Sequence, residues 1–374
     1  MRMASALALL GVLAGAATRA DRVDDAVRAD MAARHIPGLS LAVVRGGKVT
    51  KAAAYGFANL EWSVRATTET VYQLQSVTKQ FTATAVMMLV EEGRVGLDDP
   101  VSRYLEGTPA SWAAVTVRRL LTHTSGIKDF INEPTADLRL DVTEEEVLRA
   151  AASRPLNFAP GERYAYSNTN YHLLAMILRK VTGQAWSDFV HERILRPLDM
   201  RDTRLVSLAD IVPRRASGYL WEGGKLRNGR YVAPSILGYA GGGLMSTVLD
   251  MAKWDAALYT EKLLKQSALR QMWTPTKLTG GGASDYGFGW AVGSHHGHPM
   301  VTHSGAHSTG FTTAITRFPD DRLTVIVLTN QAYTADPSAI ALRVAGMVEP
   351  ALALPPSAPI VERAPPAAPA PDRR

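Results

Sequence analysis

The stretch SVTKQFTATAVMMLVEEG, residues 76–93, decides how this chain folds. Residues 85–90 are continuously apolar and the run has helix length, so we expect a helix that is buried on most sides. Gly93 is a natural C-terminal stop for it. Ser76 and Lys79 stand at its start, where this spacing places two side chains on one face of a helix, a turn apart.

This S-x-x-K pattern predicts a nucleophile. A serine hydroxyl attacks poorly at neutral pH and needs a base nearby. A lysine in a partly buried cleft can lose its proton, because desolvation disfavours its charged form. The N–H groups at a helix N-terminus also favour developing negative charge. We therefore expect Ser76 to be the nucleophile, with Lys79 beside it.

A second copy of the pattern, Ser125-Gly126-Ile127-Lys128, serves as a control. Gly126 follows its serine directly and no apolar helical run continues from it, so this copy is predicted to be a loop. The S-x-x-K spacing alone is therefore a weak signal. What singles out Ser76 is its place at the start of a long buried helix.

Two further triplets carry candidate chemistry. Tyr166-Ser167-Asn168 is the only Y-x-N in the chain; a tyrosine phenol beside a lysine can shuttle a proton, and an asparagine amide both donates and accepts hydrogen bonds. The alternative is an ordinary polar loop with a half-buried tyrosine. In His303-Ser304-Gly305, on a predicted strand, the glycine allows close approach of a substrate backbone, and a strand edge offers N–H groups to an oxyanion.

Other routes to catalysis find less support. The G-x-S-x-G of α/β-hydrolases and the H-E-x-x-H of zinc proteases are missing from the sequence. Zinc ligands usually include a carboxylate or a thiolate, and the carboxylate nearest to the histidine-rich stretch is Asp285, ten residues before its first member. We therefore predict no metal and no cofactor there. The histidines of that stretch are His295, His296, His298, His303 and His307.

Working outward, strands are predicted at both ends of the chain and helices between them. The fold class is α+β: an antiparallel sheet built from both chain ends and flanked by helices, with an inserted, mostly helical region over about residues 76–240. The expected strands are residues 39–45, 48–55, 298–304, 309–318 and 322–329. The expected helices are residues 23–34, 76–92, 116–121, 143–153, 171–182, 249–259 and 337–348.

The composition of the two ends of the chain predicts a segment outside the folded domain at each end. Arg2, an uncharged apolar stretch over residues 6–17 and small residues after it predict a signal peptide over residues 1–20, with an uncleaved anchor as the alternative. One hydrolase domain over residues 21–354 would follow. A Pro- and Ala-rich tail over residues 355–374 is predicted to be disordered. The protein is expected to be secreted, periplasmic or extracellular.

Composition also narrows the partners. The chain has 374 residues, no cysteine and a net charge of +6 that is spread along its length. Nucleic-acid binding needs a focused basic patch, which the sequence does not offer. The absence of cysteine excludes disulfides, thiolate metal sites and a cysteine nucleophile. We expect a small-molecule or peptide substrate, no nucleic acid and no stable membrane insertion after signal cleavage, with the oligomeric state left open.

The order S-x-x-K, Y-x-N, then H-S-G on a late strand resembles the serine β-lactamase and penicillin-binding-protein family. Residues 120–126 (LLTHTSG), 241–247 (GGGLMST) and 286–290 (YGFGW) are similar to further family segments. The likeness spans roughly residues 24–350. Tyrosine in the second motif points to the branch of class C β-lactamases, D-alanyl-D-alanine carboxypeptidases and β-lactamase-like esterases, and the implied fold is β-lactamase/transpeptidase-like.

The resemblance implies roles for the motif residues. Ser76 would attack the acyl carbon, Lys79 and Tyr166 would share the proton transfers, and Asn168 would orient the substrate and the lysine. The backbone N–H groups of Ser76 and Ala306 would form the oxyanion hole.

The third motif departs from the β-lactamases. Ser304 would hydrogen-bond the substrate or relay a proton, beside Gly305. His303 stands where the family often has a lysine, and a histidine titrates near neutrality. We therefore expect an acyl-enzyme hydrolase of D-amino-acid peptides, amides or small esters. The alternatives are a class C-like β-lactamase and a non-catalytic penicillin-binding-like protein.

Overall fold

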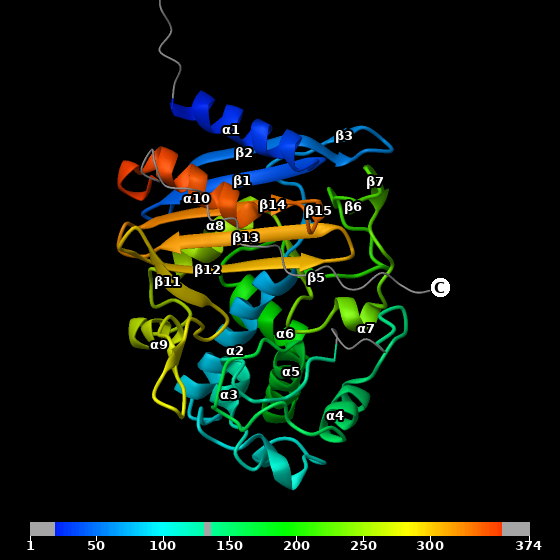
Figure 1. Cartoon of the computed structure of the whole chain (residues 1–374), viewed down its shortest axis with the longest axis vertical. Coiled ribbons are helices and arrows are strands. Elements are labelled where there is room, and N and C mark those ends of the chain that lie inside the picture. Colours follow the sequence, from blue (N-terminus) through cyan, green and yellow to red (C-terminus); the bar gives the residue numbers. More distant parts are fainter. Residues whose placement is uncertain (1–18, 131–135, 354–374) are drawn as a thin grey trace, which may run out of the picture.

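The computed structural model describes residues 19–130 and 136–353 (Figure 1). The predicted tail and all but the last two residues of the predicted signal peptide lie outside these ranges. A sheet crosses the molecule, with helices on both of its faces.

In the described part of the chain, seven strands form the main sheet, in the order β11-β12-β13-β14-β1-β2-β3. Its centre joins the two ends of the chain, because β1 pairs antiparallel with β14 from Leu39↔Thr329 to Arg45↔Leu323. The α+β class predicted from the sequence is confirmed. The strands are β1 (Gly38–Arg45), β2 (Lys48–Asn59), β3 (Val64–Arg65), β11 (Ala291–His295), β12 (His298–His307), β13 (Phe311–Phe318) and β14 (Leu323–Thr329).

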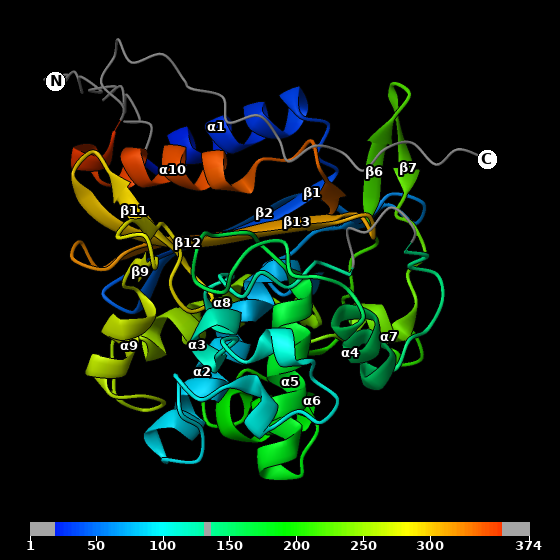
Figure 2. The same cartoon turned by 60° about the horizontal axis from the view of Figure 1, so that its bottom comes forward.

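Helices α1 (Arg19–Ala33) and α10 (Pro337–Val348) cover one face of the sheet (Figure 2). Val27 of α1 and Val344 of α10 are fully buried in a cluster with Leu41 and Val327 from the sheet. Every residue of β13 and β14 is buried, so both faces of these strands are covered. Asp336 accepts a hydrogen bond from the N–H of Ala339 and caps α10, which spans the predicted residues 337–348.

The remaining α-helices lie on the opposite face of the sheet (Figures 1 and 2). The structure assigns these as α2 (Lys79–Glu91), α3 (Val117–Leu121), α4 (Glu144–Ala152), α5 (Asn168–Thr182), α6 (Trp186–Val190), α7 (Pro234–Leu237), α8 (Val248–Ala257) and α9 (Gln266–Met272). Thr143 and Glu146 form a capping box at the start of α4, which satisfies two backbone N–H groups there.

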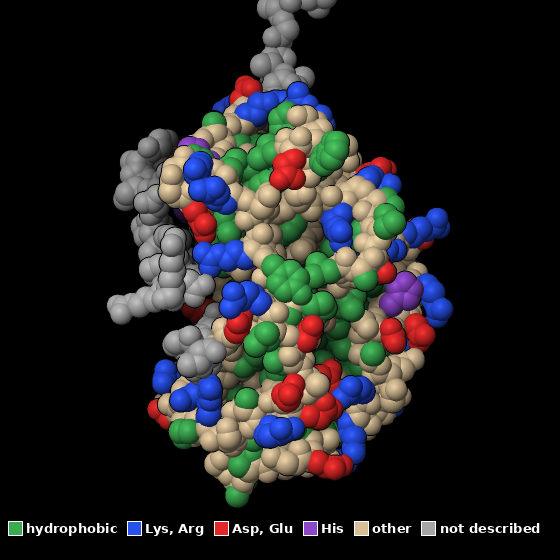
Figure 3. All heavy atoms as spheres, turned by 90° about the vertical axis from the view of Figure 1, so that its right-hand side faces the viewer, with side chains coloured by type: hydrophobic (Ala, Val, Ile, Leu, Met, Phe, Trp, Pro, Cys, Tyr) green, Lys and Arg blue, Asp and Glu red, His purple; other side chains and the backbone are tan. Residues whose placement is uncertain are grey.

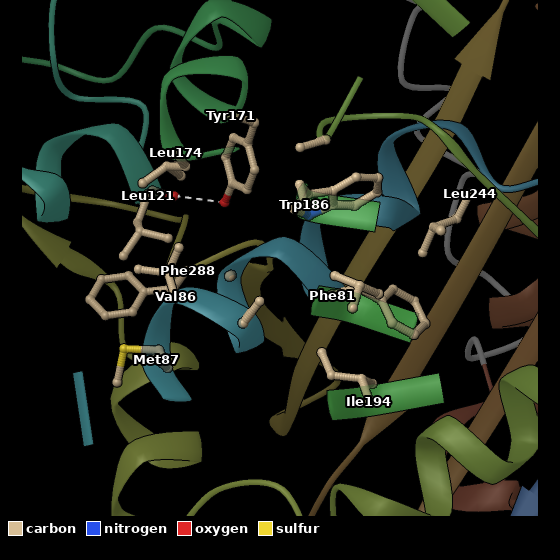
Figure 4. Packing of buried hydrophobic residues seen from close by; sticks show 14 of the residues in the cluster. Phe81, Val86, Met87, Leu121, Tyr171, Leu174, Trp186, Ile194, Leu244 and Phe288 are labelled. Atoms are coloured by element: carbon tan, nitrogen blue, oxygen red, sulfur yellow. Dashed lines mark hydrogen bonds between the residues drawn. The ribbon is translucent and has the colours of Figure 1, made fainter. Parts of the chain in front are cut away.

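Helix α2 runs through the centre of this helical side. Eleven of its residues, Lys79 to Leu89, are buried, which confirms the prediction from the apolar run. Figure 4 shows Phe81, Val86 and Met87 of α2 among side chains from the surrounding helices. Phe81 stacks on Trp254 of α8 at 4.2 Å between ring centroids. Burial of one such side chain contributes about 1.5–3 kcal/mol, so α2 is held in place along its length.

A buried ion pair links the sheet to α8. Arg317 on β13 donates to Asp255 of α8 at 2.5 Å, and Thr324 on β14 donates to the same carboxylate oxygen at 2.6 Å. Trp254, the neighbour of Asp255, donates from its indole to Gln80 of α2 at 3.0 Å. Helix α8 therefore fixes α2, including Lys79, against the sheet.

Shorter elements complete the fold. Strand β8 pairs with both β4 and β5, β6 pairs with β7 and β15, and β9 pairs with β10. Their bounds are β4 (Tyr72–Gln73), β5 (Arg204–Leu205), β6 (Tyr219–Glu222), β7 (Lys225–Asn228), β8 (Leu244–Ser246), β9 (Thr276–Lys277), β10 (Ala283–Ser284) and β15 (Gln331–Ala332). The short helical turns are η1 (Gln75–Thr78), η2 (Val101–Arg103), η3 (Ala110–Trp112), η4 (His191–Leu195) and η5 (Pro350–Leu352).

Two predicted helix starts are wrong in ways that matter for the site. Residues 75–78 form the 3-10 turn η1, and α2 begins at Lys79 rather than at Ser76. Helix α5 begins at Asn168 rather than at Tyr171. Both motifs therefore straddle a helix N-terminus instead of lying within or before a helix.

The surface mixes charges of both signs. On the face in Figure 3, Lys and Arg alternate with Asp and Glu, and hydrophobic side chains gather in the middle. Within residues 19–130 and 136–353, every helix falls short of the length and apolarity needed to cross a membrane.

Candidate active site

The turn η1 presents Ser76 from the end of β4. Side chains three residues apart eclipse one another in a 3-10 helix, and Lys79 Nζ donates to Ser76 Oγ at 3.1 Å. Gln75, just before the serine, has a φ of 53°, a left-handed conformation that is costly for a residue with a side chain. Its amide nitrogen donates to Gln73 at 2.8 Å and Thr309 at 3.1 Å, and these bonds hold the turn.

Lys79 is completely buried. Besides Ser76, its Nζ donates to Asn168 Oδ1 at 3.0 Å and to the carbonyl of Gly241 at 2.7 Å. Burial lowers the pKa of Lys79 to about 7, and the negative charge of Asp129 acts in the opposite direction. A substantial fraction of Lys79 is thus a neutral amine near neutral pH, able to accept the serine proton.

Tyr166 lies on the other side of the serine. Its phenol donates to Ser76 Oγ at 2.8 Å, and its ring centroid is 4.8 Å from Lys79 Nζ. Burial raises the pKa of Tyr166 well above its usual value of 10. The phenol is therefore neutral at neutral pH and acts as a hydrogen-bond donor. Between Lys79 and Tyr166, the lysine is the group whose pKa suits a base.

Asn168 occupies the first turn of α5. Its Oδ1 accepts from Lys79 and, at 2.7 Å, from the phenol of Tyr239, while its Nδ2 donates to Asp129 Oδ2 at 2.9 Å. A Cβ added to Gly241 would lie 2.4 Å from the Tyr239 ring and 3.1 Å from Lys79 Nζ. Glycine there lets the Tyr239 loop close over the lysine.

His303 is buried on β12 and neutral. Its Nδ1 donates to the carbonyl of Ser304 at 2.7 Å, so its Nε2 accepts from the phenol of Tyr286 at 2.8 Å. Burial and, to a lesser extent, the charge of Lys79 lower the pKa of His303 to about 3. Both ring nitrogens are engaged, and the position that often holds a lysine in the family carries no charge at neutral pH.

The rest of the third motif lies along the edge of β12. A Cβ added to Gly305 would lie 2.4 Å from the carbonyl oxygen of Leu74 and 2.6 Å from the backbone nitrogen of Ser76. Glycine therefore lets β12 contact the turn η1. Ser304 and Ala306, on either side, are exposed. The register with β11 ends at Thr302. The predicted oxyanion donors, Ser76 and Ala306, therefore belong to two segments in contact.

A buried histidine supports Tyr166 from behind. The ring centroids of His123 and Tyr166 are 4.3 Å apart. His123 Nδ1 accepts from the backbone N–H of Ser167 and from Asn170 Nδ2, each at 3.2 Å. Burial lowers the pKa of His123 well below 6.5, which fits this acceptor role. His123 comes from the segment over residues 120–126 that the sequence singled out without a role.

The structure thus joins Ser76, Lys79, Tyr166 and Asn168 through hydrogen bonds. It places the third motif against the turn η1. Sequence reasoning missed Asp129, Tyr239, Tyr286 and Gln75. Tyr286 lies in a segment that was noticed only as a likeness to the family, and Asp129 follows the second S-x-x-K directly. These two positions in the sequence were the signals that could have pointed to Tyr286 and Asp129.

The histidine-rich stretch separates into individual roles. His298 bonds to Asp321 at 2.9 Å and His295 to the carbonyl of Leu352 at 3.2 Å, while His303 bonds to Tyr286. Over residues 19–130 and 136–353, no three His, Asp or Glu side chains are grouped as a metal site would require.

Comparison with curated proteins indicates a family. The family model described as Beta-lactamase matches residues 23–347. Penicillin-binding protein 4* of Bacillus subtilis is 31% identical over 306 residues, which cover 76% of this chain and 66% of that protein. Protein flp of Staphylococcus aureus is 28% identical over 83% of this chain and 62% of that protein. The chain therefore spans less than two thirds of the length of these relatives.

Solved structures agree with this. The octameric penicillin-binding protein homologue from Pyrococcus abyssi has a TM-score of 0.77 and 30% identity, over 88% of this chain and 77% of that one. The D-amino acid amidase from Ochrobactrum anthropi SV3 has a TM-score of 0.76 and 26% identity, over 89% and 100%. Since the family model spans most of the chain, and the fold and motif residues agree with it, this chain belongs to the Beta-lactamase family.

Proposed function

We propose that this protein hydrolyses D-amino-acid peptides, amides or small carboxylic esters through an acyl-enzyme on Ser76. Within the D-alanyl-D-alanine carboxypeptidase and esterase type, it would favour substrates that carry no carboxylate beside the bond that is cleaved. The observation that carries the proposal is the neutral His303, locked between Tyr286 and its own strand. A site without a fixed cation at this position suits an uncharged amide or ester group better than a carboxylate.

In the acylation step, Ser76 Oγ attacks the carbonyl carbon of the substrate while its proton passes to the neutral amine of Lys79. The backbone N–H groups of Ser76 and Ala306 stabilise the oxyanion. The tetrahedral intermediate collapses as Lys79, through the phenol of Tyr166, returns a proton to the leaving amine or alcohol. The products of this step are the Ser76 ester and the free leaving group.

In the deacylation step, water attacks the ester and the same lysine acts again as the base. The water proton passes to Lys79, the bond between the acyl carbon and Ser76 Oγ breaks, and Oγ recovers a proton. The short contacts of Ser76 Oγ with both Lys79 and Tyr166 allow either group to deliver it.

Substrate preference follows from charge. Lys79 is engaged as the base and is buried, so it is poorly placed to hold a substrate carboxylate. The structural neighbours support the same class of substrate, because they include a D-amino acid amidase and a D-stereospecific amidohydrolase.

A class C-like β-lactamase is the second candidate, because the family and the serine, lysine and tyrosine contacts are compatible with it. It requires rapid deacylation of a substrate that carries a carboxylate, and the neutral His303 disfavours that. A non-catalytic penicillin-binding-like protein is the third candidate. The lowered pKa of Lys79 argues against it, since burying this amine serves no purpose in a protein without acid–base chemistry.

One panel of assays separates these candidates. The purified protein, Ser76→Ala and Ser125→Ala are each given a D-amino-acid p-nitroanilide, a p-nitrophenyl ester, a chromogenic cephalosporin and benzylpenicillin. We expect turnover of the anilide or ester that Ser76→Ala abolishes and Ser125→Ala retains. Rapid cephalosporin turnover would instead identify a β-lactamase. No turnover, and no mass adduct with benzylpenicillin, would leave the non-catalytic protein.

The site of action is proposed from the sequence. We propose that the protein works outside the cytoplasm, after removal of residues 1–20. Fractionation of the native host and N-terminal sequencing of the mature protein test this, and an N-terminus at Met1 in the cytoplasmic fraction would contradict it.

A further inference from the structure

The Asn168 amide has both of its ends engaged. The oxygen accepts from Lys79 at 3.0 Å and from Tyr239 at 2.7 Å, and the nitrogen donates to Asp129 at 2.9 Å. The two ends of an amide have nearly the same shape, so it can turn over within the same volume unless its partners distinguish oxygen from nitrogen.

The partners of Asn168 differ in how strongly they distinguish the two ends. The phenol of Tyr239 can rotate to donate or accept, so it tolerates either orientation. A carboxylate can only accept. If the amide turned over, its oxygen would face the Asp129 oxygen, with no proton between them. Of these two residues, Asp129 is therefore the one that selects the observed orientation.

The orientation of Asn168 sets the direction of the lysine lone pair. The nitrogen of a neutral primary amine carries two N–H bonds, one lone pair and its bond to carbon in a tetrahedral arrangement. Around Lys79 the fixed acceptors are the Gly241 carbonyl at 2.7 Å and Asn168 Oδ1 at 3.0 Å. When they take the two N–H bonds, the lone pair is left for Ser76 Oγ at 3.1 Å. A turned-over Asn168 would remove one acceptor and free the amine to donate to the serine instead.

We propose that Asp129 is a positioning residue which, by holding the Asn168 amide in one orientation, aims the lone pair of Lys79 at Ser76. The inference rests on the proposed function, in which Lys79 takes the serine proton. Asp129 makes the connection from the loop that follows the second Ser-x-x-Lys segment.

Charge adds a second effect with its own signature. Burial raises the pKa of each phenol that faces Lys79 and lowers the pKa of each imidazole, so these groups are neutral near pH 7. The negative charge of Asp129 raises the pKa of Lys79 against the effect of burial. Loss of that charge therefore lowers the pKa of Lys79. The neutral groups facing it are Tyr166, Tyr171, Tyr239, His123 and His303.

The test uses Asp129→Asn, which keeps the shape of the side chain but can donate or accept. The matched control is Asp137→Asn, which removes a carboxylate from the exposed part of the same connection, where Asp137 pairs with Arg139 at 2.8 Å. The probe is an alkyl fluorophosphonate. Ser76 Oγ forms a bond to phosphorus, the P–F bond breaks, fluoride leaves and the serine proton passes to Lys79. Intact mass gives the labelling rate at each pH.

For the parent and Asp137→Asn, we expect the labelling rate to rise with pH through about 7, as Lys79 loses its proton. For Asp129→Asn, we expect a plateau about 10- to 100-fold lower, as for a misplaced catalytic group, and a midpoint at lower pH. Tyr239→Phe is expected to keep the midpoint and lose less of the plateau. The double variant is expected to lose more than the two single effects combined.

A second readout needs no catalysis. The Tm of Lys79→Met is compared with that of the parent across pH. The pH at which the Tm of the parent begins to rise relative to that of the variant marks the titration of Lys79. The same pair is made in the Asp129→Asn background, where the gain is expected to begin at lower pH. Lack of labelling in the parent would count against the proposed function, and this readout would still show whether the charge of Asp129 acts on Lys79.

Two results would overturn the inference. One is an Asp129→Asn protein with the labelling rate and midpoint of the Asp137→Asn control. The other is an Asp129→Asn protein that has a lower Tm and less labelled material, but in which both readouts give the parent's midpoint for the titration of Lys79. A merely structural carboxylate would give this result, because its loss would reduce the folded fraction without moving the titration of Lys79.

Discussion

The chain contains two Ser-x-x-Lys segments, residues 76–79 and 125–128, and the fold uses them in opposite ways. The first forms a 3-10 turn that leads into α2. The second contains no helix, because Gly126 has a φ of 79° and a Cβ there would lie 2.3 Å from the carbonyl oxygen of Phe158. The same residue pattern therefore gives two different backbones, as the control comparison in the sequence predicted.

The side chains diverge accordingly. Ser76 Oγ accepts from both Lys79 and Tyr166 and is partly exposed. Ser125 is buried, donates to Asn170 Oδ1 at 2.7 Å and accepts from its own loop at 3.1 Å. The proton of Ser76 has a base within reach, whereas the proton of Ser125 is held in a fixed hydrogen bond. A serine becomes a candidate nucleophile through its partners rather than through its spacing from a lysine.

The second segment nevertheless supports the first. Asn170, the partner of Ser125, also donates to His123, which packs against Tyr166. The carbonyl of Lys128 accepts from Thr169 of α5 at 2.7 Å. The loop is thus tied to the two residues of α5 that directly follow Asn168. Variants of the two segments should separate chemistry from support.

The largest difference is expected between Ser76→Ala and Ser125→Ala. Loss of the nucleophile should lower kcat/KM on the best ester or amide by at least about 10³-fold, with little change in Tm, because Ser76 is only partly buried. Ser125→Ala should keep kcat/KM within a few-fold and lower stability by about 1–3 kcal/mol, since Asn170 loses its buried partner. Equal losses of activity in the two variants would show that the segments are not functionally distinct.

Lys79→Met should rank next, with a loss of about 10²- to 10⁴-fold in kcat/KM. In the parent, kcat/KM should rise with pH through about 7, because the neutral amine of Lys79 is the active form. Initial rates with an uncharged ester between pH 5 and 9 measure this limb. An acid limb that persisted in Lys79→Met would assign the titration to another group.

The difference in stability between the parent and Lys79→Met should change with pH in a direction that can be checked. The folded-state pKa of Lys79, about 7, lies below its ordinary value of 10.5. Between these values the unfolded chain binds the proton and the folded chain does not, so the parent gains stability relative to Lys79→Met as the pH rises. Below pH 7 both states are protonated and the difference is constant. A difference in Tm that fell between pH 7 and 10 would contradict the buried amine.

A smaller effect is expected from the backbone of the second segment. Gly126→Ala forces an unfavourable φ and a contact with Phe158, and we expect a loss of roughly 3 kcal/mol. Gly107→Ala is the matched control: its φ is 78°, with nothing within 4 Å of an added Cβ, so only the backbone cost of about 1–2 kcal/mol applies. Denaturant midpoints measure both. Similar losses would mean that the loop can move away from Phe158.

Much of this site could be predicted from short motifs, because each motif is fixed by local structure. Ser76 and Lys79 depend on one turn and one apolar helix, and Tyr166 with Asn168 depends on one helix start. The wrong helix start at Ser76 also has a local origin. Because 3-10 turns are frequent at the ends of α-helices, the apolar pattern could not distinguish the turn η1 from the first turn of α2.

The residues that escaped prediction act through long-range contacts. Tyr239 reaches Asn168 across 71 residues and Asp129 reaches it across 39. Each is a single polar residue in a loop, and no periodicity marks it. What joins them is the packing of the loops over α2 and α5, which depends on the whole fold. Tyr286 likewise became a partner of His303 only once β12 lay beside its loop.

The smallest effect is expected for Lys128→Met, and it sharpens the contrast with Lys79→Met. The backbone carbonyl of Lys128, rather than its ammonium group, is what binds Thr169, and this bond survives the substitution. We expect Tm to change by the equivalent of about 0.5 kcal/mol or less and kcat/KM to stay within about twofold, with the same acid limb. Thr169→Val is the control that removes the bond itself. If Lys128→Met moved the acid limb, the lysine next to Asp129 would have to be counted in the charge balance around Lys79, and the two Ser-x-x-Lys segments would be coupled through their lysines as well as through α5.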